Sequence, residues 1–247
     1  MSGHSKWAQI KRQKGVADIK RGQSFTKLSN AITIAVRESR GVTNPDQNFR
    51  LRLAIDRARD VNMPKENIDR AIQRASGKQA EELKSVVYEA FGPGGISLII
   101  EAATDNKLRT TSEVKNVLEK NGVTLGTPGA VSYQFLTKGL IIVKKNNKTV
   151  DDIFLEAADA GAEDIEEAGD EVFIYTKPDE LGAIRDLVSK NLQIVSAELT
   201  RKPSITVSIS DKETAKKILR VLGKIENLDD VQKIYSNFDI PDELIKE

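Results

Sequence analysis

A basic run opens the chain, and its residue types suit contact with nucleic acid. Residues 1–23 hold six Lys and Arg side chains against one acidic residue, Asp18. Lys and Arg neutralise phosphates, a tryptophan ring stacks on bases, and an imidazole contacts a phosphate or a base edge. The candidate nucleic-acid-binding residues of this run and of the residues just after it are His4, Lys6, Trp7, Lys11, Arg12, Lys14, Lys20, Arg21 and Lys27.

Two readings of this run compete, a binding arm and a solvated tail. Trp7 favours the arm, because it is the only tryptophan of the chain and its large apolar ring is costly to leave in water. His4 lacks the fixed partner and pocket that a general base needs, so contact with a phosphate or base edge is the better interpretation. An uninvolved surface histidine is the alternative for His4.

The charge of the chain is divided unevenly along its length. The whole chain has a net charge of only +1, but residues 1–78 hold 17 Lys and Arg against 7 Asp and Glu. Residues 79–247 hold 21 against 30. Such asymmetry predicts that the basic part binds an anionic polymer or surface.

The residue types that usually carry catalysis are scarce. Without cysteine the chain has no disulfide, thiolate zinc site or cysteine nucleophile, and its one histidine excludes a multi-histidine metal cage. The turn Gly92-Pro93-Gly94-Gly95 leads into a strand-like run instead of the Gly-Lys-Ser/Thr of a phosphate-binding loop. We therefore expect no enzyme activity, no cofactor and no metal site. The acidic stretch 151–171 contains no Lys or Arg and predicts a solvated face or a surface that binds a basic protein.

The elements that position the basic residues are predicted to be three helices over residues 24–76. Ser24 is a plausible N-cap for an apolar stripe that begins at Phe25, Asn44-Pro45-Asp46 makes a turn, and Pro64 opens the third helix. We assign residues 1–23 to a basic arm and 24–78 to a helical domain. Arg50 and Arg57 lie seven residues apart outside the apolar stripe, and we expect them to contact phosphates.

The rest of the chain predicts an α+β class with two ferredoxin-like units, one inserted in the other. From Leu140 the order strand, helix, strand, strand, helix, strand is the split βαβ arrangement. Strands are predicted before it at 86–91, 96–101 and 130–135, and after it at 205–208 and 230–235. The domains are therefore 79–138 plus 201–247, which is discontinuous, and 139–200, which is inserted.

Several motifs along the chain resemble the YebC family. They include Gly3-His4-Ser5-Lys6-Trp7, Asn48-Phe49-Arg50, Tyr88-Glu89-Ala90-Phe91-Gly92-Pro93-Gly94-Gly95, Thr104-Asp105-Asn106 with Arg109-Thr110, and Asp230-Val231-Gln232 through Asp239. The resemblance implies a helical N-terminal domain followed by two α+β domains. It also implies a non-catalytic protein, because bacterial members are described as probable DNA-binding transcriptional regulators, and relatives are linked to translation on the ribosome.

These observations lead to one favoured function and two alternatives. We expect a nucleic-acid-binding regulator that acts on translation through rRNA, tRNA or the ribosome, because a basic arm with a stacking ring suits RNA. A DNA-binding transcriptional regulator and a protein-interaction scaffold that uses the acidic half are the alternatives. No signal-peptide run or membrane-length apolar stretch occurs, so we expect a cytoplasmic protein without a membrane partner, and a monomer.

Overall fold

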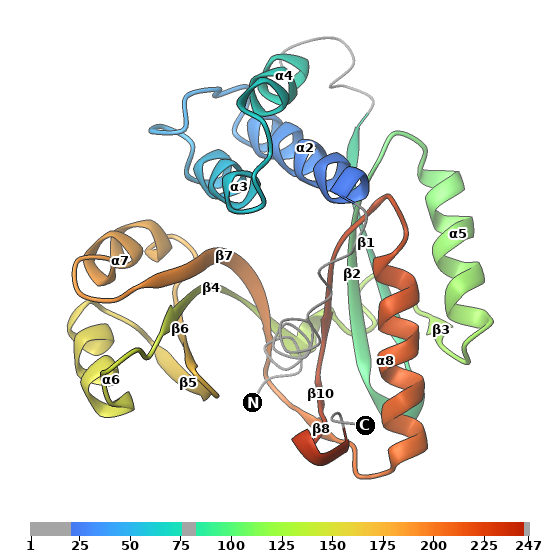
Figure 1. The fold of residues 1–247 in the computed structure, drawn as a ribbon. Helices are drawn as coiled ribbons and strands as arrows, with labels where there is room; N and C mark the ends of the chain where they lie inside the picture. Colours follow the sequence, from blue (N-terminus) through green and yellow to red (C-terminus); the bar gives the residue numbers. More distant parts are fainter. Residues whose placement is uncertain (1–20, 76–82, 245–247) are drawn as a thin grey trace.

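The computed structural model describes residues 21–75 and 83–244, which form one helical module and two α+β modules (Figure 1). The helical module consists of α2 (Arg21–Glu38), α3 (Phe49–Asp60) and α4 (Lys65–Ala75). The three predicted helices are thus confirmed, but α2 begins at Arg21, so Ser24 lies inside this helix and is not its N-cap, and the helix extends into the segment assigned to the arm. Within the described ranges, no helix combines the length and the apolar character needed to cross a membrane.

The three helices pack on a shared apolar core that contains Ile32, Leu51 and Ile68. Asn48, which is 4% exposed, fixes α3 against α2. Its Oδ1 accepts a hydrogen bond from the N–H of Leu51 at 3.1 Å and so caps α3, while its Nδ2 donates to the carbonyl of Ala35 at 3.0 Å. One side chain therefore satisfies orphan groups on both helices.

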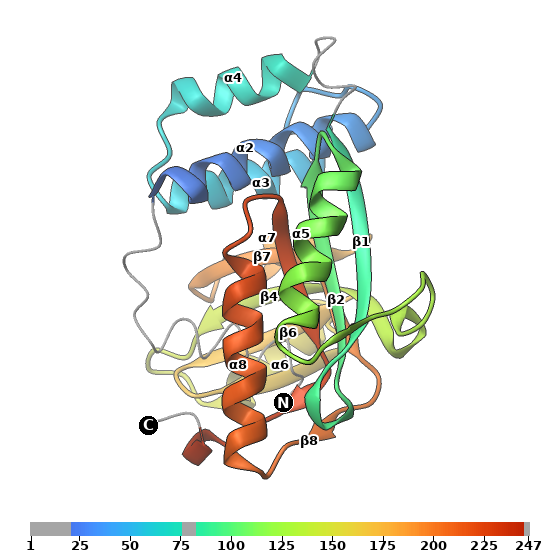
Figure 2. The same ribbon diagram turned by 90° about the vertical axis from the view of Figure 1, so that its right-hand side faces the viewer.

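The second module is built on an antiparallel sheet with the strand order β3-β1-β2-β9. Its helices α5 and α8 cover one face of this sheet (Figure 2). β9 pairs with β2, so the residues that follow the inserted unit join a sheet that begins before it. The elements are β1 (Lys84–Phe91), β2 (Ser97–Thr104), α5 (Lys107–Glu119), β3 (Thr124–Leu125), α8 (Lys212–Glu226) and β9 (Val231–Ser236).

Two predicted strands of this module require correction. Residues 130–134 do not extend the sheet, because Ser132–Gln134 forms a 3₁₀ turn and the short β3 lies beside β1 instead. Of residues 205–208 only β8 (Val207–Ser208) is a strand, and it pairs in parallel with β10 (Phe238–Asp239) in a separate small sheet. A last 3₁₀ turn covers Asp242–Leu244. The turn Pro93–Gly95 joins β1 to β2, as predicted, with positive φ at Gly94 and Gly95.

The third module has the strand order β5-β6-β4-β7, with α6 and α7 on one face. This is the ferredoxin-like arrangement that the pattern from Leu140 predicts. β4 and β7 are longer than predicted and run across the boundaries drawn at 138/139 and 200/201. The elements are β4 (Phe135–Lys144), α6 (Val150–Asp159), β5 (Asp164–Ala168), β6 (Glu171–Thr176), α7 (Leu181–Val188) and β7 (Ile194–Pro203).

The helical module lies across the ends of β1, β2 and β9, and its α3 faces α7 and β7 (Figures 1 and 2). An ion pair of 3.1 Å between Arg185 Nη1 and Asp56 Oδ2 joins α7 to α3. The ring of Phe49 packs against the backbone at Gly182, where an added Cβ would lie 3.0 Å from the ring. The helical module thus contacts both α+β modules.

Candidate nucleic-acid interface

The predicted binding residues of the arm lie outside the residues that the structure describes. These are His4, Lys6, Trp7, Lys11, Arg12, Lys14 and Lys20. Arg21 is the first residue of α2. The assignments of these residues to phosphate and base contacts therefore stay predictions.

The three other predicted residues all have protein partners. Lys27 Nζ donates to the backbone carbonyl of Glu226 at the end of α8. Arg50 forms an ion pair with Glu38 of α2. Arg57 Nη1 lies 3.0 Å from Glu198 Oε2 of β7, and Lys233 Nζ of β9 lies 3.0 Å from the same oxygen. Two of these cations, Lys27 and Arg57, therefore hold modules together in this structure.

Lys27, Arg50 and Arg57 line one cleft of about 790 Å³, which we call the interdomain cleft. Its other walls come from β1, β2, β4, β7, β9 and the end of α8. Arg201 Nε donates to Glu101 Oε1 at 2.8 Å, and the hydroxyl of Tyr235 donates to the other oxygen of Glu101 at 3.3 Å. Burial, reinforced by the Glu101 carboxylate, raises the pKa of Tyr235 well above its ordinary value, so this hydroxyl keeps its proton.

A second concave surface of about 250 Å³ lies between α2 and α4, on a different face of α2. We call it the α2–α4 groove. Its polar lining comprises Thr26, Ser29 and Asn30 of α2 and Asn67, Arg70 and Arg74 of α4. Arg70 and Arg74 are one turn apart, so both guanidinium groups leave the same face of α4.

Arg70 and Arg74 differ from the predicted cations in their partners. Both are exposed, and neither pairs with a carboxylate among residues 21–75 and 83–244. A guanidinium without a carboxylate is available to phosphate, whereas the cations at the interdomain cleft would have to exchange a partner first. The sequence did carry a signal for this pair, namely two arginines four residues apart opposite the apolar stripe of Ile68, Ile72 and Ala75.

Comparison with known proteins identifies the family. The N-terminal domain model of the TACO1/YebC proteins matches residues 5–78, and the model of their second and third domains matches residues 83–238. The chain belongs to the TACO1/YebC family. The resemblance seen in the sequence is therefore confirmed.

Relatives of this TACO1/YebC chain match it over almost its whole length. A probable transcriptional regulatory protein of Sulfurihydrogenibium sp. is 45% identical, with 100% of this chain and 98% of the relative covered. A probable transcriptional regulatory protein from Herpetosiphon aurantiacus is 48% identical, with 99% of this chain and 97% of the relative covered. A crystal structure of a conserved hypothetical protein from Aquifex aeolicus superposes with a TM-score of 0.85 at 41% identity, covering 93% of this chain and 95% of that one. The α+β fold class is thereby confirmed.

Family motif residues in the second module have structural roles. Arg109 Nη2 of α5 lies 2.8 Å from Asp230 Oδ2, and the Thr110 hydroxyl donates to the same oxygen. Burial alone would raise the pKa of Asp230, but the hydrogen bonds from Arg109 and Thr110 outweigh it and lower that pKa below its ordinary value. Asn106 caps α5 by accepting from the N–H of Arg109 at 3.1 Å. These residues fix α5 to the start of β9.

Proposed function

We propose that this TACO1/YebC protein is a nucleic-acid-binding regulator of gene expression that acts on translation, through RNA or the ribosome. We further propose that it acts by binding and not by catalysis. The observation that carries the proposal is the α2–α4 groove, where Arg70 and Arg74 stand without carboxylate partners among the described residues. Guanidinium groups bind phosphate through two parallel hydrogen bonds, which gives orientation as well as affinity.

The polar groups of the groove suit a strand whose bases are accessible. Asn30 and Asn67 each carry a donor and an acceptor, and such amides recognise base edges. Arg70 and Arg74 lie beside them and would hold the phosphates of the same strand. Single-stranded loops and ends of RNA expose both groups together, which supports RNA as the ligand.

The N-terminal turn of α4 argues against insertion of this helix into a DNA major groove. Recognition helices present base-reading side chains from their first turns. Here Glu66 in the first turn of α4 and Asp69 directly after that turn are both exposed. Their carboxylates would face the phosphates that flank the groove, and this repulsion disfavours such docking.

A DNA-binding transcriptional regulator is the second candidate, and the names of the relatives support it. Those proteins are called probable transcriptional regulatory proteins. The arginines of the α2–α4 groove would serve this function as well, because phosphate contacts carry no sequence information.

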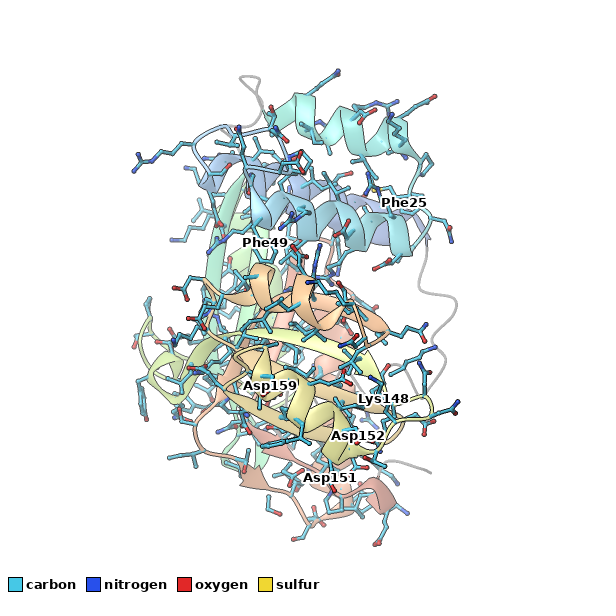
Figure 3. All side chains as sticks on the ribbon, turned by 90° about the vertical axis from the view of Figure 1, so that its left-hand side faces the viewer. Phe25, Phe49, Lys148, Asp151, Asp152 and Asp159 are labelled. Atoms are coloured by element: carbon cyan, nitrogen blue, oxygen red, sulfur yellow. The ribbon has the colours of Figure 1, made fainter. Side chains whose placement is uncertain are left out.

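A protein-interaction scaffold is the third candidate, and α6 supports it. Asp151, Asp152 and Asp159 are exposed on this helix, at the outer face of the inserted module (Figure 3). Phe154 and Leu155 lie between these aspartates in the sequence, and their exposed fractions are 53% and 61%. Exposed apolar side chains with an acidic rim suit a basic, amphipathic protein surface. This surface would complement nucleic-acid binding without replacing it.

Equilibrium binding of the full chain to three ligands tests the proposed function. The ligands are a structured RNA, a single-stranded RNA and duplex DNAs of varied sequence, each titrated at several salt concentrations. We expect the RNAs to bind more tightly and the duplexes to show little discrimination among sequences. Duplex binding that is sequence-specific and persists at high salt would instead establish the transcriptional function. Absence of binding to all three would contradict both and leave the scaffold.

A further inference from the structure

The interdomain cleft is separate from the α2–α4 groove, and its size and lining indicate a function of its own. Its volume of about 790 Å³ falls within the range of roughly 300–1,000 Å³ that is common for ligand sites. All three modules contribute to its walls.

Two polar atoms of the lining are buried and have no hydrogen-bond partner among residues 21–75 and 83–244. They are Oγ1 of Thr200 on β7 and Nε2 of Gln232 on β9. Thr200 is only 2% exposed. Buried polar groups are almost always hydrogen-bonded, because leaving one unsatisfied is costly. Both atoms belong to side chains that line the cleft but are themselves closed off from it, so a ligand in the cleft supplies the missing partners once these two side chains turn toward it.

The remaining lining fixes the chemical class of that ligand. Half-buried Leu28 and Ile34 of α2, with Val87 of β1 at 41% exposure, form an apolar wall. The charged side chains described in the lining are five cations and four carboxylates. Most of these groups neutralise one another in ion pairs, so the cleft is left with one excess positive charge. A ligand with a flat apolar face, a polar edge and one negative charge matches this lining.

We propose that the interdomain cleft binds one unstacked nucleotide, with its base against the apolar wall and its base edge bonded to Thr200 and Gln232. A nucleotide unit has each required feature, because a base has an apolar face and a hydrogen-bonding edge, and each phosphodiester carries one negative charge. The same base and sugar occur in a free nucleoside monophosphate, whose phosphate carries a charge of about −1.5 to −2 at pH 7, and in one residue of a strand. The test below separates these two sources.

Phe25 connects this site to the proposed nucleic-acid interface. Its side chain lines both the interdomain cleft and the α2–α4 groove, near the start of α2 (Figure 3). A strand held by Arg70 and Arg74 can therefore pass Phe25 and place its next base in the cleft. This polymer route rests on the proposed function, whereas the binding of a single nucleotide does not.

Titration calorimetry of the full chain with the four nucleoside monophosphates tests the site directly. A single-stranded RNA and the same strand with one abasic residue are titrated in parallel. Thr200→Val removes the hydroxyl and keeps the shape, and Gln232→Met removes the amide. We expect each variant to bind the ligand about three- to tenfold more weakly, which is the worth of one hydrogen bond. Thermal stability should not fall, because neither the Thr200 hydroxyl nor the Gln232 amide nitrogen has a partner among the residues that the structure describes.

Ser236→Ala is the matched control, because Ser236 Oγ is also buried without a partner in the described part of the chain but does not line the cleft. Its ligand affinities should equal those of the unaltered protein. The proposal is overturned if Thr200→Val and Gln232→Met bind every ligand as the unaltered protein does, or if Ser236→Ala weakens binding as much as they do. If intact and abasic strands also bind equally well, the proposal of a nucleotide site in the cleft is wrong while the proposed function stands. If monophosphates bind through Thr200 but no strand binds, the cleft stands and the proposed function fails.

Discussion

Reversing two charges, Arg70→Glu together with Arg74→Glu, should weaken binding of the full chain to RNA by about 100-fold near 0.1 M salt. Each phosphate contact on a single strand contributes roughly 0.7 to the slope of log K against log salt, so loss of two contacts alone costs about 25-fold at this concentration. Repulsion between the new carboxylates and the phosphates adds the rest. Fluorescence anisotropy over a salt series would show both the lower affinity and a slope reduced by roughly 1.4.

The matched control reverses two charges on another helix. Lys216 and Arg220 are exposed on α8 and are also four residues apart, so Lys216→Glu with Arg220→Glu makes the same change in net charge at the same spacing. We expect that variant to bind within about threefold of the unaltered protein, because only long-range repulsion acts and salt screens it. Equal losses in the two double variants would mean that net charge, and not the α2–α4 groove, governs binding.

Arg57→Ala separates the groove from the sequence-predicted cations. Because Arg57 pairs with Glu198, its loss should loosen the contact between α3 and β7. Its effect on the affinity for RNA should be small. A fall in affinity comparable with that of the Arg70 and Arg74 variant would restore Arg57 to the interface.

Helices and strands with a regular apolar period could be predicted from the sequence. The stripe that begins at Phe25 defines α2, and the order of elements from Leu140 defines the inserted module. The prediction of a strand at 130–135 was wrong, because the spacing of Val131 and Phe135 suits a strand as well as a turn. A distant carboxylate decides between them, since Glu89 of β1 holds this segment by its backbone.

The candidate site was only partly predictable, because here too partners distant in the sequence decide the outcome. A basic helical domain follows from charge counting, and Arg70 and Arg74 follow from helical spacing. Which cations remain available depends on partners far along the chain, such as Glu198 for Arg57 and the Glu226 carbonyl for Lys27. The interdomain cleft could not be predicted at all, because its walls come from separate modules whose docking leaves no local pattern.

Glu89 is the carboxylate on which the loop after β3 depends. It is 6% exposed, and its two oxygens accept hydrogen bonds from the backbone N–H groups of Gly129, Val131 and Ser132 at 2.8, 2.6 and 2.9 Å. Its own carbonyl accepts from the N–H of Gly126 at 2.7 Å. Burial would raise the pKa of Glu89, but the three backbone donors outweigh it and lower that pKa below its ordinary value.

Glu89→Gln should therefore lower the free energy of unfolding at pH 7 by about 3 kcal/mol. The amide has one acceptor oxygen where the carboxylate has two, and its NH₂ group would face backbone donors that need an acceptor. Chemical denaturation of both proteins measures the difference. Glu113→Gln, at an exposed position of α5, is the control and should change stability by less than about 0.5 kcal/mol.

The pH dependence of this difference gives an independent check on the role of the charge. Because the folded-state pKa of Glu89 is lowered, the carboxylate contributes its full stability above its ordinary pKa in the unfolded chain. That contribution is lost as the pH falls from there through the lowered pKa. The gap between the unaltered protein and Glu89→Gln, which cannot titrate at this position, should therefore be constant near neutral pH and narrow in acid. A gap that stays constant throughout the acid range would mean that Glu89 acts by its shape and not by its charge.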